Sequence, residues 1–380
     1  MSAKIKPLIQ IFSTGLALFS MFFGAGNVVF PLLIGREAGT QVGVALLGIG
    51  ISGVLFPFLG LIAMMHYRGD LRAFLRRLGE GPGFICLFLL NIIMGPIVIS
   101  RLFTLMHASI TMILPISLEL CSVLLCALVF ALTYRAQRII SLLGIILTPV
   151  LLLVLALLVI AGLRGAPDPV QPVASSWTLA LNGLKGGYQM MDLLGALLFS
   201  TLIIPHVMGT SQQEGNFSKN MIGASVVAAL LLLISYAGLG WVAAHHSAHL
   251  SPSLPPEALL GALSYHVLGE SGAYLASAIV FLACLTTAIS LAAVFAHFLQ
   301  HDLFKEKIGP KTSLGIALSM PAMVATLGFE GIMRLASPLL DVIYPALIVL
   351  CLVNIARWPV RAPVFFSLGF TAGALCMRMV

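Results

Sequence analysis

Charged side chains are scarce in this chain of 380 residues. Lys and Arg together number 20 and Asp and Glu 13, so charged residues make up 9% of the sequence, whereas hydrophobic residues make up 60%. No charge occurs from Pro7 through Gly35. So few charges cannot cover a water-soluble surface, and the mean hydropathy of +1.09 is typical of a polytopic membrane protein.

Several chemical motifs are also missing. The six cysteines fall within or beside apolar stretches and include no C-x-x-C pair, which argues against a disulfide framework and a zinc site. The sequence has no P-loop, no H-E-x-x-H string and no G-x-S-x-G string. We therefore expect neither an enzyme nor a bound cofactor. A channel is the alternative from a different class, although no filter-like string is present.

Apolar stretches predict a single transmembrane domain over residues 1–380. The first stretch is too long for a cleaved signal, and no small-residue cleavage site follows it. The chain is expected to be all α-helical, with eleven spans. These spans lie near 8–34, 40–65, 82–107, 116–134, 139–163, 187–207, 219–243, 272–298, 312–329, 335–354 and 363–379.

Lysine and arginine are distributed unequally between the two sets of loops. With the N-terminus in the cytoplasm, 14 of the 20 basic residues fall in cytoplasmic loops and five in outer loops, while Arg101 lies within a span. Because cytoplasmic loops are enriched in Lys and Arg, this distribution predicts a cytoplasmic N-terminus. The net charge of +7 is therefore a signal of membrane orientation beside lipid, and we expect no nucleic-acid partner.

The string FFGAGNVVFP, Phe22 to Pro31, interrupts the first span. Two glycines, an amide and a proline stand where a membrane helix would be continuous. Unpaired backbone in hydrocarbon costs several kcal/mol per group unless protein, cavity water or a ligand satisfies it. A broken helix at membrane depth is therefore a candidate binding site, and such helices recur in transporters.

A second interruption is expected five spans later, in GALLFSTLIIP from Gly195 to Pro205. Four of six residues agree between GLALFS, which begins at Gly15, and GALLFS. Because five is odd, span six crosses the membrane in the opposite direction to span one, as in inverted repeats with paired broken helices. We predict repeat one over about 8–163, repeat two over about 187–354, and an extra helix over about 363–379.

Four motifs resemble those of the branched-chain amino acid:cation symporters, a bacterial family similar in fold to the leucine-transporter superfamily. The motifs are FFGAGNVVFP, GGYQMMDLLGALLFS at Gly186–Ser200, LACLTTAISL at Leu282–Leu291 and VIYPALIVL at Val342–Leu350. The chain departs from the family pattern at several positions. Met190 stands where the family has Thr, Ser200 where it has Gly, and Ser100 where a second proline precedes Arg101.

The resemblance implies a leucine-transporter-like fold with a five-plus-five inverted repeat and broken spans one and six. It also implies a multi-pass protein of the bacterial inner membrane that imports leucine, isoleucine and valine. Import would be driven by a sodium gradient through alternating access, with no obligatory protein partner. Two alternatives stay open, namely proton coupling and a broader specificity for apolar amino acids. Asp192, His206 and His297 are the proton carriers considered.

The substrate site is expected between the breaks of spans one and six. Backbone N–H groups at the start of the second half-helix would hold the substrate carboxylate, because a helix N-terminus carries partial positive charge and free donors. Glycine there permits close approach. The predicted substrate-binding residues are Gly24, Ala25, Gly26, Asn27, Phe199 and Ser200.

A sodium site is expected between spans one and eight, as the resemblance implies. The paired hydroxyls of Thr286 and Thr287 supply oxygen, the ligand that hard cations prefer. Carbonyl groups would complete the site, and its predicted members are Ser20, Phe23, Ala283, Thr286 and Thr287.

Three charges lie within predicted spans, where ionisable residues are rare and by default functional. Arg101 and Asp341 are expected to pair as an outer gate above the substrate, with Asp192 nearby. In the competing interpretation, the Arg101 side chain extends to the membrane surface, and Asp341 and Asp192 cap the N-termini of their helices.

Overall fold

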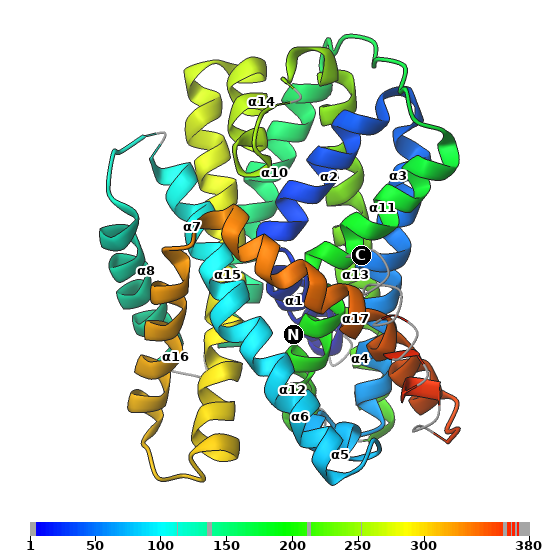
Figure 1. Ribbon diagram of the computed structural model, residues 1–380, viewed down its shortest axis with the longest axis vertical. Coiled ribbons are helices and arrows are strands. Elements are labelled where there is room, and N and C mark those ends of the chain that lie inside the picture. Colours follow the sequence, from blue (N-terminus) through cyan, green and yellow to red (C-terminus); the bar gives the residue numbers. More distant parts are fainter. Residues whose placement is uncertain are drawn as a thin grey trace, which may run out of the picture.

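The computed structural model is a bundle of helices (Figure 1). It describes residues 5–111, 113–134, 139–210, 214–251, 253–359, 363–365, 367–368 and 371. Every regular element within these residues is helical. Six helical stretches are long and apolar enough to cross a membrane, or seven if a bent pair is taken as one span. The expectation of an all-α membrane protein is confirmed.

Helices occupy the first five expected spans. A 3-10 turn, η1 (Gly39–Gln41), follows the first span, and the short helix α5 connects the second to the third. The helices are α1 (Ile5–Phe22), α2 (Ala25–Ala38), α3 (Val42–Ile49), α4 (Phe56–Met65), α5 (Leu71–Arg76), α6 (Glu80–Ile92), α7 (Val98–Ile110), α8 (Leu118–Thr133), α9 (Ile139–Ser141) and α10 (Thr148–Leu163).

Helices also occupy expected spans six to ten, while most of expected span eleven lies outside the described residues. The loop between the seventh and eighth spans contains a helix, α14, that the hydropathy pattern did not indicate. The helices are α11 (Ser176–Met190), α12 (Asp192–Thr210), α13 (Glu214–His245), α14 (Leu259–Leu268), α15 (Glu270–Phe298), α16 (Pro310–Ala325) and α17 (Gly328–Ile355). The helix of span six begins at Ser176, so the expected start of this span at 187 is wrong, while the boundaries of the two repeats stay predictions.

Several spans contain a π-helical segment. Pro96 lies inside one of them, where its missing N–H removes a hydrogen bond from the helical ladder. Such segments often mark functional positions. They are η2 (Gly50–Leu55), η3 (Ile93–Ile97), η5 (Leu142–Leu147) and η8 (Leu299–Leu303).

Contacts between two spans have counterparts between the two spans that correspond to them in the other repeat, five positions away in the chain order. The second span packs on the sixth, through α3 with α11 and α4 with α12, while the seventh span, α13, packs on both halves of the first. Likewise α7 contacts α16, and α8 contacts α15. This exchange of partners is the pattern expected of two repeats with a common fold, which supports the five-plus-five organisation.

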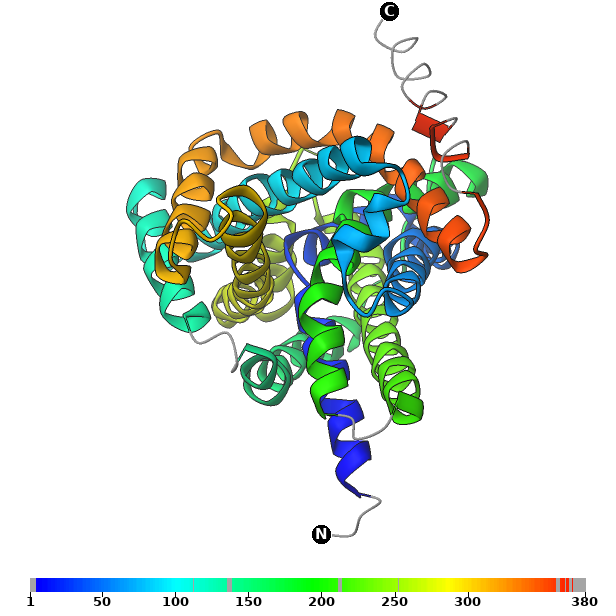
Figure 2. The same ribbon diagram turned by 90° about the horizontal axis from the view of Figure 1, so that it is seen from below.

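The middle parts of the first and sixth spans lie inside the bundle, whereas the first turns of α1 project from it (Figure 2), with Leu8, Ile9 and Phe12 exposed. In the view from below (Figure 2), α1 and α12 lie close to each other, and α17 runs along one side, where it contacts α4 and α7. Helix α5 lies at the lower end in Figure 1 and α14 at the upper end. We call these the α5 end and the α14 end of the bundle.

Helix α3 packs very closely on α11. A methyl group at Gly183 would lie 1.9 Å from the carbonyl oxygen of Ala45, and one at Gly48 would lie 2.3 Å from that of Ala180. Small residues permit such close approach in membrane proteins, where packing drives helix association.

We therefore expect Gly183→Ala to separate α3 from α11 and to destabilise the protein by about 1–3 kcal/mol, as overpacking does. Thermal unfolding of purified protein in detergent measures this loss. Gly315→Ala is the matched control, because nothing lies within 4 Å of a methyl group at that helical position. Equal unfolding temperatures for the two variants would contradict the packing argument.

Candidate functional site

The first span breaks where the glycine-rich string predicts. Helix α1 ends at Phe22 and α2 begins at Ala25, with Gly24 in an extended conformation between them. The Gly24 amide donates to the side-chain Oδ1 of Asn27 at 3.0 Å, so this amide is satisfied by a side chain. Gly26 lies in the first turn of α2. The prediction that a half-helix starts at Ala25 is confirmed.

The second break lies at Met191, which adopts a left-handed conformation with φ of 67° between α11 and α12. The expected interruption at Gly195–Pro205 is wrong, because this segment is continuous helix. The hydroxyl of Ser200 donates to the carbonyl of Leu197 at 2.6 Å. GALLFS therefore follows its break, whereas GLALFS precedes its own, and the two strings are not equivalent in the repeat.

The two breaks contact each other. A methyl group at Gly26 would lie 2.9 Å from the Cα of Met190 and 2.7 Å from Nη2 of Arg101. Beside this contact is a cavity of about 20 Å³, which suffices for roughly one water molecule. Residues of both breaks and of α7 and α15 line it, namely Met21, Phe22, Gly24, Ala25, Gly26, Asn27, Met94, Val98, Arg101, Leu102, Met190, Met191, Asp192, Gly195, Phe199 and Thr287.

The predicted substrate-binding residues are brought together with one exception. Gly24, Ala25, Gly26, Asn27 and Phe199 all line the cavity. Ser200 follows Asp192 by eight residues, on the order of 12 Å along the helix. Its carbonyl oxygen would lie 2.9 Å from a methyl group on Gly69, in the connection between α4 and α5. We therefore remove Ser200 from the candidate site.

A buried polar cluster joins the two breaks. The side-chain amide Nδ2 of Asn27 donates to Oδ2 of Asp192 at 2.6 Å and to the hydroxyl of Tyr236 at 2.5 Å. The Tyr236 hydroxyl donates to the same carboxylate oxygen at 3.2 Å. All three residues are buried. Asp192 is thus more than a helix cap, since it links α12 to α2 and to α13.

Arg101 lies at the breaks, not at the membrane surface. Its side chain is only 2% exposed. Nη1 donates to the carbonyl of Gln189 at 3.0 Å and lies 3.4 Å from the sulfur of Met333, while buried Nε has no hydrogen-bond partner. The alternative in which Arg101 reaches outward is therefore wrong. The side chain of Asp341 lies outside the described residues, so the gate pairing of Arg101 with Asp341 stays a prediction.

Thr287 faces the end of the first half-helix. Its hydroxyl lies 3.3 Å from the carbonyl of Ser20 and 3.2 Å from that of Met21. Gly24 permits this approach, because a methyl group there would lie 2.9 Å from the Thr287 hydroxyl oxygen. The neighbouring Thr286 instead donates to Ala283 in its own helix at 2.9 Å. Sequence reasoning thus found the contact between α1 and α15, although not which threonine makes it.

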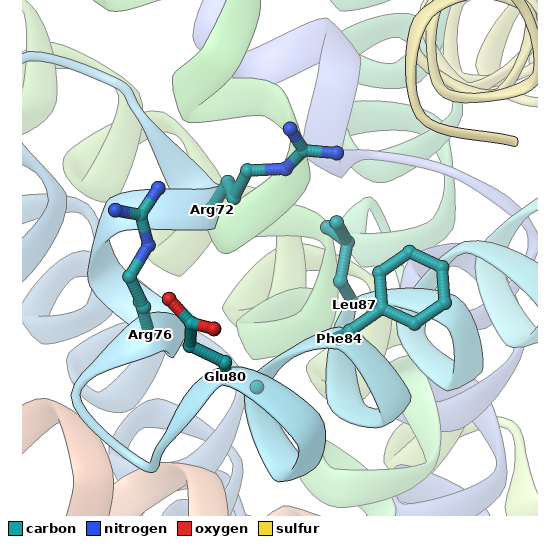
Figure 3. Close-up of a pocket in the computed structure, with 6 residues that line it drawn as sticks. Arg72, Arg76, Glu80, Phe84 and Leu87 are labelled. Carbon is teal, nitrogen blue, oxygen red and sulfur yellow. The ribbon is translucent and has the colours of Figure 1, made fainter. Parts of the chain in front are cut away.

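Two larger pockets lie away from the breaks, at the α5 end. One, of about 250 Å³, is bordered by Arg72 and Arg76 of α5 and by Glu80 and Phe84 of α6 (Figure 3). The other, of about 360 Å³, is bordered by residues of α5, α6, α12, α15 and η8. Between these elements Arg72 forms an ion pair with Asp302 at 2.5 Å. Neither pocket contains a residue of the two breaks.

Histidines at the α14 end do not form a metal centre. The rings of His249 and His266 stack at 4.5 Å, and His246 lies 5.3 Å from His266. His246 also bonds to the carbonyl of Gly162. Within the described residues, no group of three histidine, cysteine or acidic side chains is arranged to hold a metal ion.

Comparisons with known proteins agree with this architecture. The closed conformation of Mhp1, a nucleobase-cation-symport-1 family transporter, aligns with a TM-score of 0.65 at 15% identity, over 90% of this chain and 77% of that one. A Na⁺-coupled sialic acid symporter aligns with a TM-score of 0.58 at 12% identity, over 91% and 78%. At these identities the likeness shows the fold alone, which is leucine-transporter-like.

Sequence relatives are permeases. The branched-chain amino acid permease BrnQ of Bacillus subtilis strain 168 is 28% identical over 364 residues, covering 91% of this chain and 80% of the permease. The permease BrnQ of Escherichia coli K12 is 25% identical over 376 residues, which cover 95% of this chain and 85% of the permease. Both are named as transporters, not enzymes. The family described as branched-chain amino acid transport protein matches residues 8–376, and this chain therefore belongs to that family.

Proposed function

We propose that this protein imports leucine, isoleucine and valine by sodium-coupled symport through alternating access. The observation that carries the proposal is the contact between two broken spans at a buried cavity with Thr287 in its lining. Membership of a family of branched-chain amino acid transport proteins supports the substrate class. The relatives in Bacillus subtilis and Escherichia coli are named as permeases for these amino acids.

Apolar side chains around the cavity suit a branched aliphatic substrate. Beyond the backbone of the breaks, the lining includes Met94, Val98, Leu102, Met191 and Phe199. An apolar pocket distinguishes one methylene by only about 1–3 kcal/mol. We therefore expect leucine, isoleucine and valine to compete with one another for the same site.

The cavity of about 20 Å³ is too small for any of these amino acids. The surrounding helices must separate for substrate to enter, as alternating access requires. The fold also aligns better with the closed conformation of Mhp1, at a TM-score of 0.65, than with its inward-facing conformation, at 0.58. Both observations support a closed state of a transporter that opens to each side in turn.

Sodium would bind at the carbonyl end of α1. The last carbonyls of a helix have no partner within it and carry partial negative charge. The Thr287 hydroxyl already lies 3.3 Å from the carbonyl oxygen of Ser20 and 3.2 Å from that of Met21. Oxygen donors of this kind suit a hard cation. Phe23, Ala283 and Thr286 stay predicted members of this sodium site. In the proposed mechanism Na⁺ is transported together with the substrate.

We propose a bacterial inner-membrane location with a cytoplasmic N-terminus and the α5 end facing the cytoplasm. The basic residues of the α5 region and of the segment after η8 support this orientation. On this assignment the pocket of about 360 Å³ would be the inner vestibule, and the ion pair between Arg72 and Asp302 would join elements at its mouth.

Proton coupling is the second candidate, favoured by one observation. Asp192 is a buried carboxylate that lines the cavity and accepts hydrogen bonds from Asn27 and Tyr236. A group of this kind can exchange a proton when the cavity opens to water. His297 lines the pocket at the α5 end instead, away from the breaks.

Gly26→Leu is expected to abolish substrate binding while the protein remains folded in the membrane. The new side chain would meet Arg101 and Met190 and fill the contact between the breaks. Uptake of labelled leucine by proteoliposomes measures the effect. Gly315→Leu, with open space around it, is the control that should transport normally. Leucine uptake by the Gly26 variant at the wild-type rate would remove the breaks from consideration as the substrate site.

Thr287→Val retains the side-chain shape and removes the oxygen. We expect the sodium concentration for half-maximal uptake to rise by about tenfold or more, by analogy with lost metal-site interactions. Thr133→Val is a suitable control, because the Thr133 hydroxyl is buried without a hydrogen-bond partner in α8. An unchanged sodium dependence for the Thr287 variant would refute the proposed sodium site.

A further inference from the structure

We propose that Arg101 and Asp192 form a charge clamp that recognises the two ionised groups of a free α-amino acid. Arg101 receives the α-carboxylate, and Asp192 receives the α-ammonium group. This inference rests on the proposed function, because it names how the same cavity selects its substrate. It differs from the expectation that backbone N–H groups alone hold the carboxylate.

The geometry around Arg101 is that of an anion receptor. Its Nη2 lies against the first turn of α2, where a methyl group on Gly26 would be 2.7 Å away. The N-terminus of a helix carries partial positive charge, so two positive groups face each other in a buried place. Their mutual repulsion is relieved when an anion binds between them. A carboxylate suits this position, because guanidinium groups bind it in a planar, two-pronged arrangement.

The hydrogen bonds of Arg101 leave it capacity for such a partner. The guanidinium has five N–H donors, and Nη1 is engaged by Gln189 and Met333. Nε is buried without a partner. Among the described residues, no carboxylate lies within ion-pair distance of Arg101. A buried charge is strongly unfavourable without a partner of opposite charge, and a substrate carboxylate would supply one to Arg101.

Asp192 presents the opposite charge to the same cavity. It begins α12, and both of its hydrogen bonds, from Asn27 and Tyr236, go to the single oxygen Oδ2. These two donors fix the carboxylate against α2 and α13. An ammonium group, with three donors and no acceptor, is the natural partner of such a carboxylate. The cavity thus carries one fixed charge of each sign, which matches the two charges of a zwitterion.

The clamp determines which molecules the site accepts. Substrates need both a free carboxylate and a free ammonium group, with the side chain directed toward the apolar lining. Leucinamide, which lacks the carboxylate, and 4-methylpentanoate, which lacks the ammonium group, are both expected to bind poorly. Each missing charged hydrogen-bonded contact is expected to weaken binding by about 10- to 100-fold.

The test measures the affinities of purified protein for leucine, leucinamide and 4-methylpentanoate. Titrated shifts of the unfolding temperature report binding without a labelled ligand, and they also show that each variant is folded. Arg101→Gln is expected to lose most of its preference for leucine over leucinamide while still rejecting 4-methylpentanoate. Asp192→Asn is expected to do the reverse. Arg334→Gln, an exposed arginine beside Glu330, should keep both preferences.

This exchange of preferences is a result that a merely structural role would not produce. If Arg101→Gln does not fold, Arg101→Lys, which keeps the charge but not the planar fork, is expected to reduce the same preference by a smaller factor. If the folded Arg101 and Asp192 variants keep the wild-type ratios of affinity for leucine, leucinamide and 4-methylpentanoate, the clamp is overturned but the proposed function is not. A wild-type protein that binds none of leucine, isoleucine and valine would overturn the proposed function itself.

Discussion

The backbone groups freed at Gly24 and Met191 are the constraint on which the rest of this structure depends. In hydrocarbon each such group must find a partner inside the protein. The four half-helix ends also carry partial charges, positive at the starts of α2 and α12 and negative at the ends of α1 and α11. Polar side chains from distant parts of the sequence gather there because nothing else at that depth can satisfy these ends.

Three of the four ends meet a complementary side chain. The Thr287 hydroxyl lies against the end of α1, Arg101 donates to the end of α11, and the Asp192 carboxylate stands at the start of α12. The start of α2 is the exception, since it faces the cation of Arg101. On the proposed function, the side chains that would bind an ion and a charged substrate are those that stabilise the two broken helices.

How far the sequence predicts this site depends on the residue type at each break. Gly24 and Gly26 reveal the first break, because glycine inside a membrane helix is a visible signal. The second break has no glycine: Met191 is held in a left-handed conformation by its surroundings, so the apolar string that follows was mistaken for it. Asp192 was the available signal, as an acidic residue at a helix start. The depth of Arg101 could not be read from span boundaries, since long side chains reach several ångströms from their backbone.

The most direct test of sodium-driven transport is uptake of labelled leucine into proteoliposomes that contain only this protein. Three conditions are compared at equal membrane potential: an inward sodium gradient, equal sodium on both sides, and an inward proton gradient without sodium. The account predicts accumulation above equilibrium with the sodium gradient and only equilibration when sodium is equal. Accumulation driven by the proton gradient alone, or no saturable leucine uptake under any condition, would contradict it.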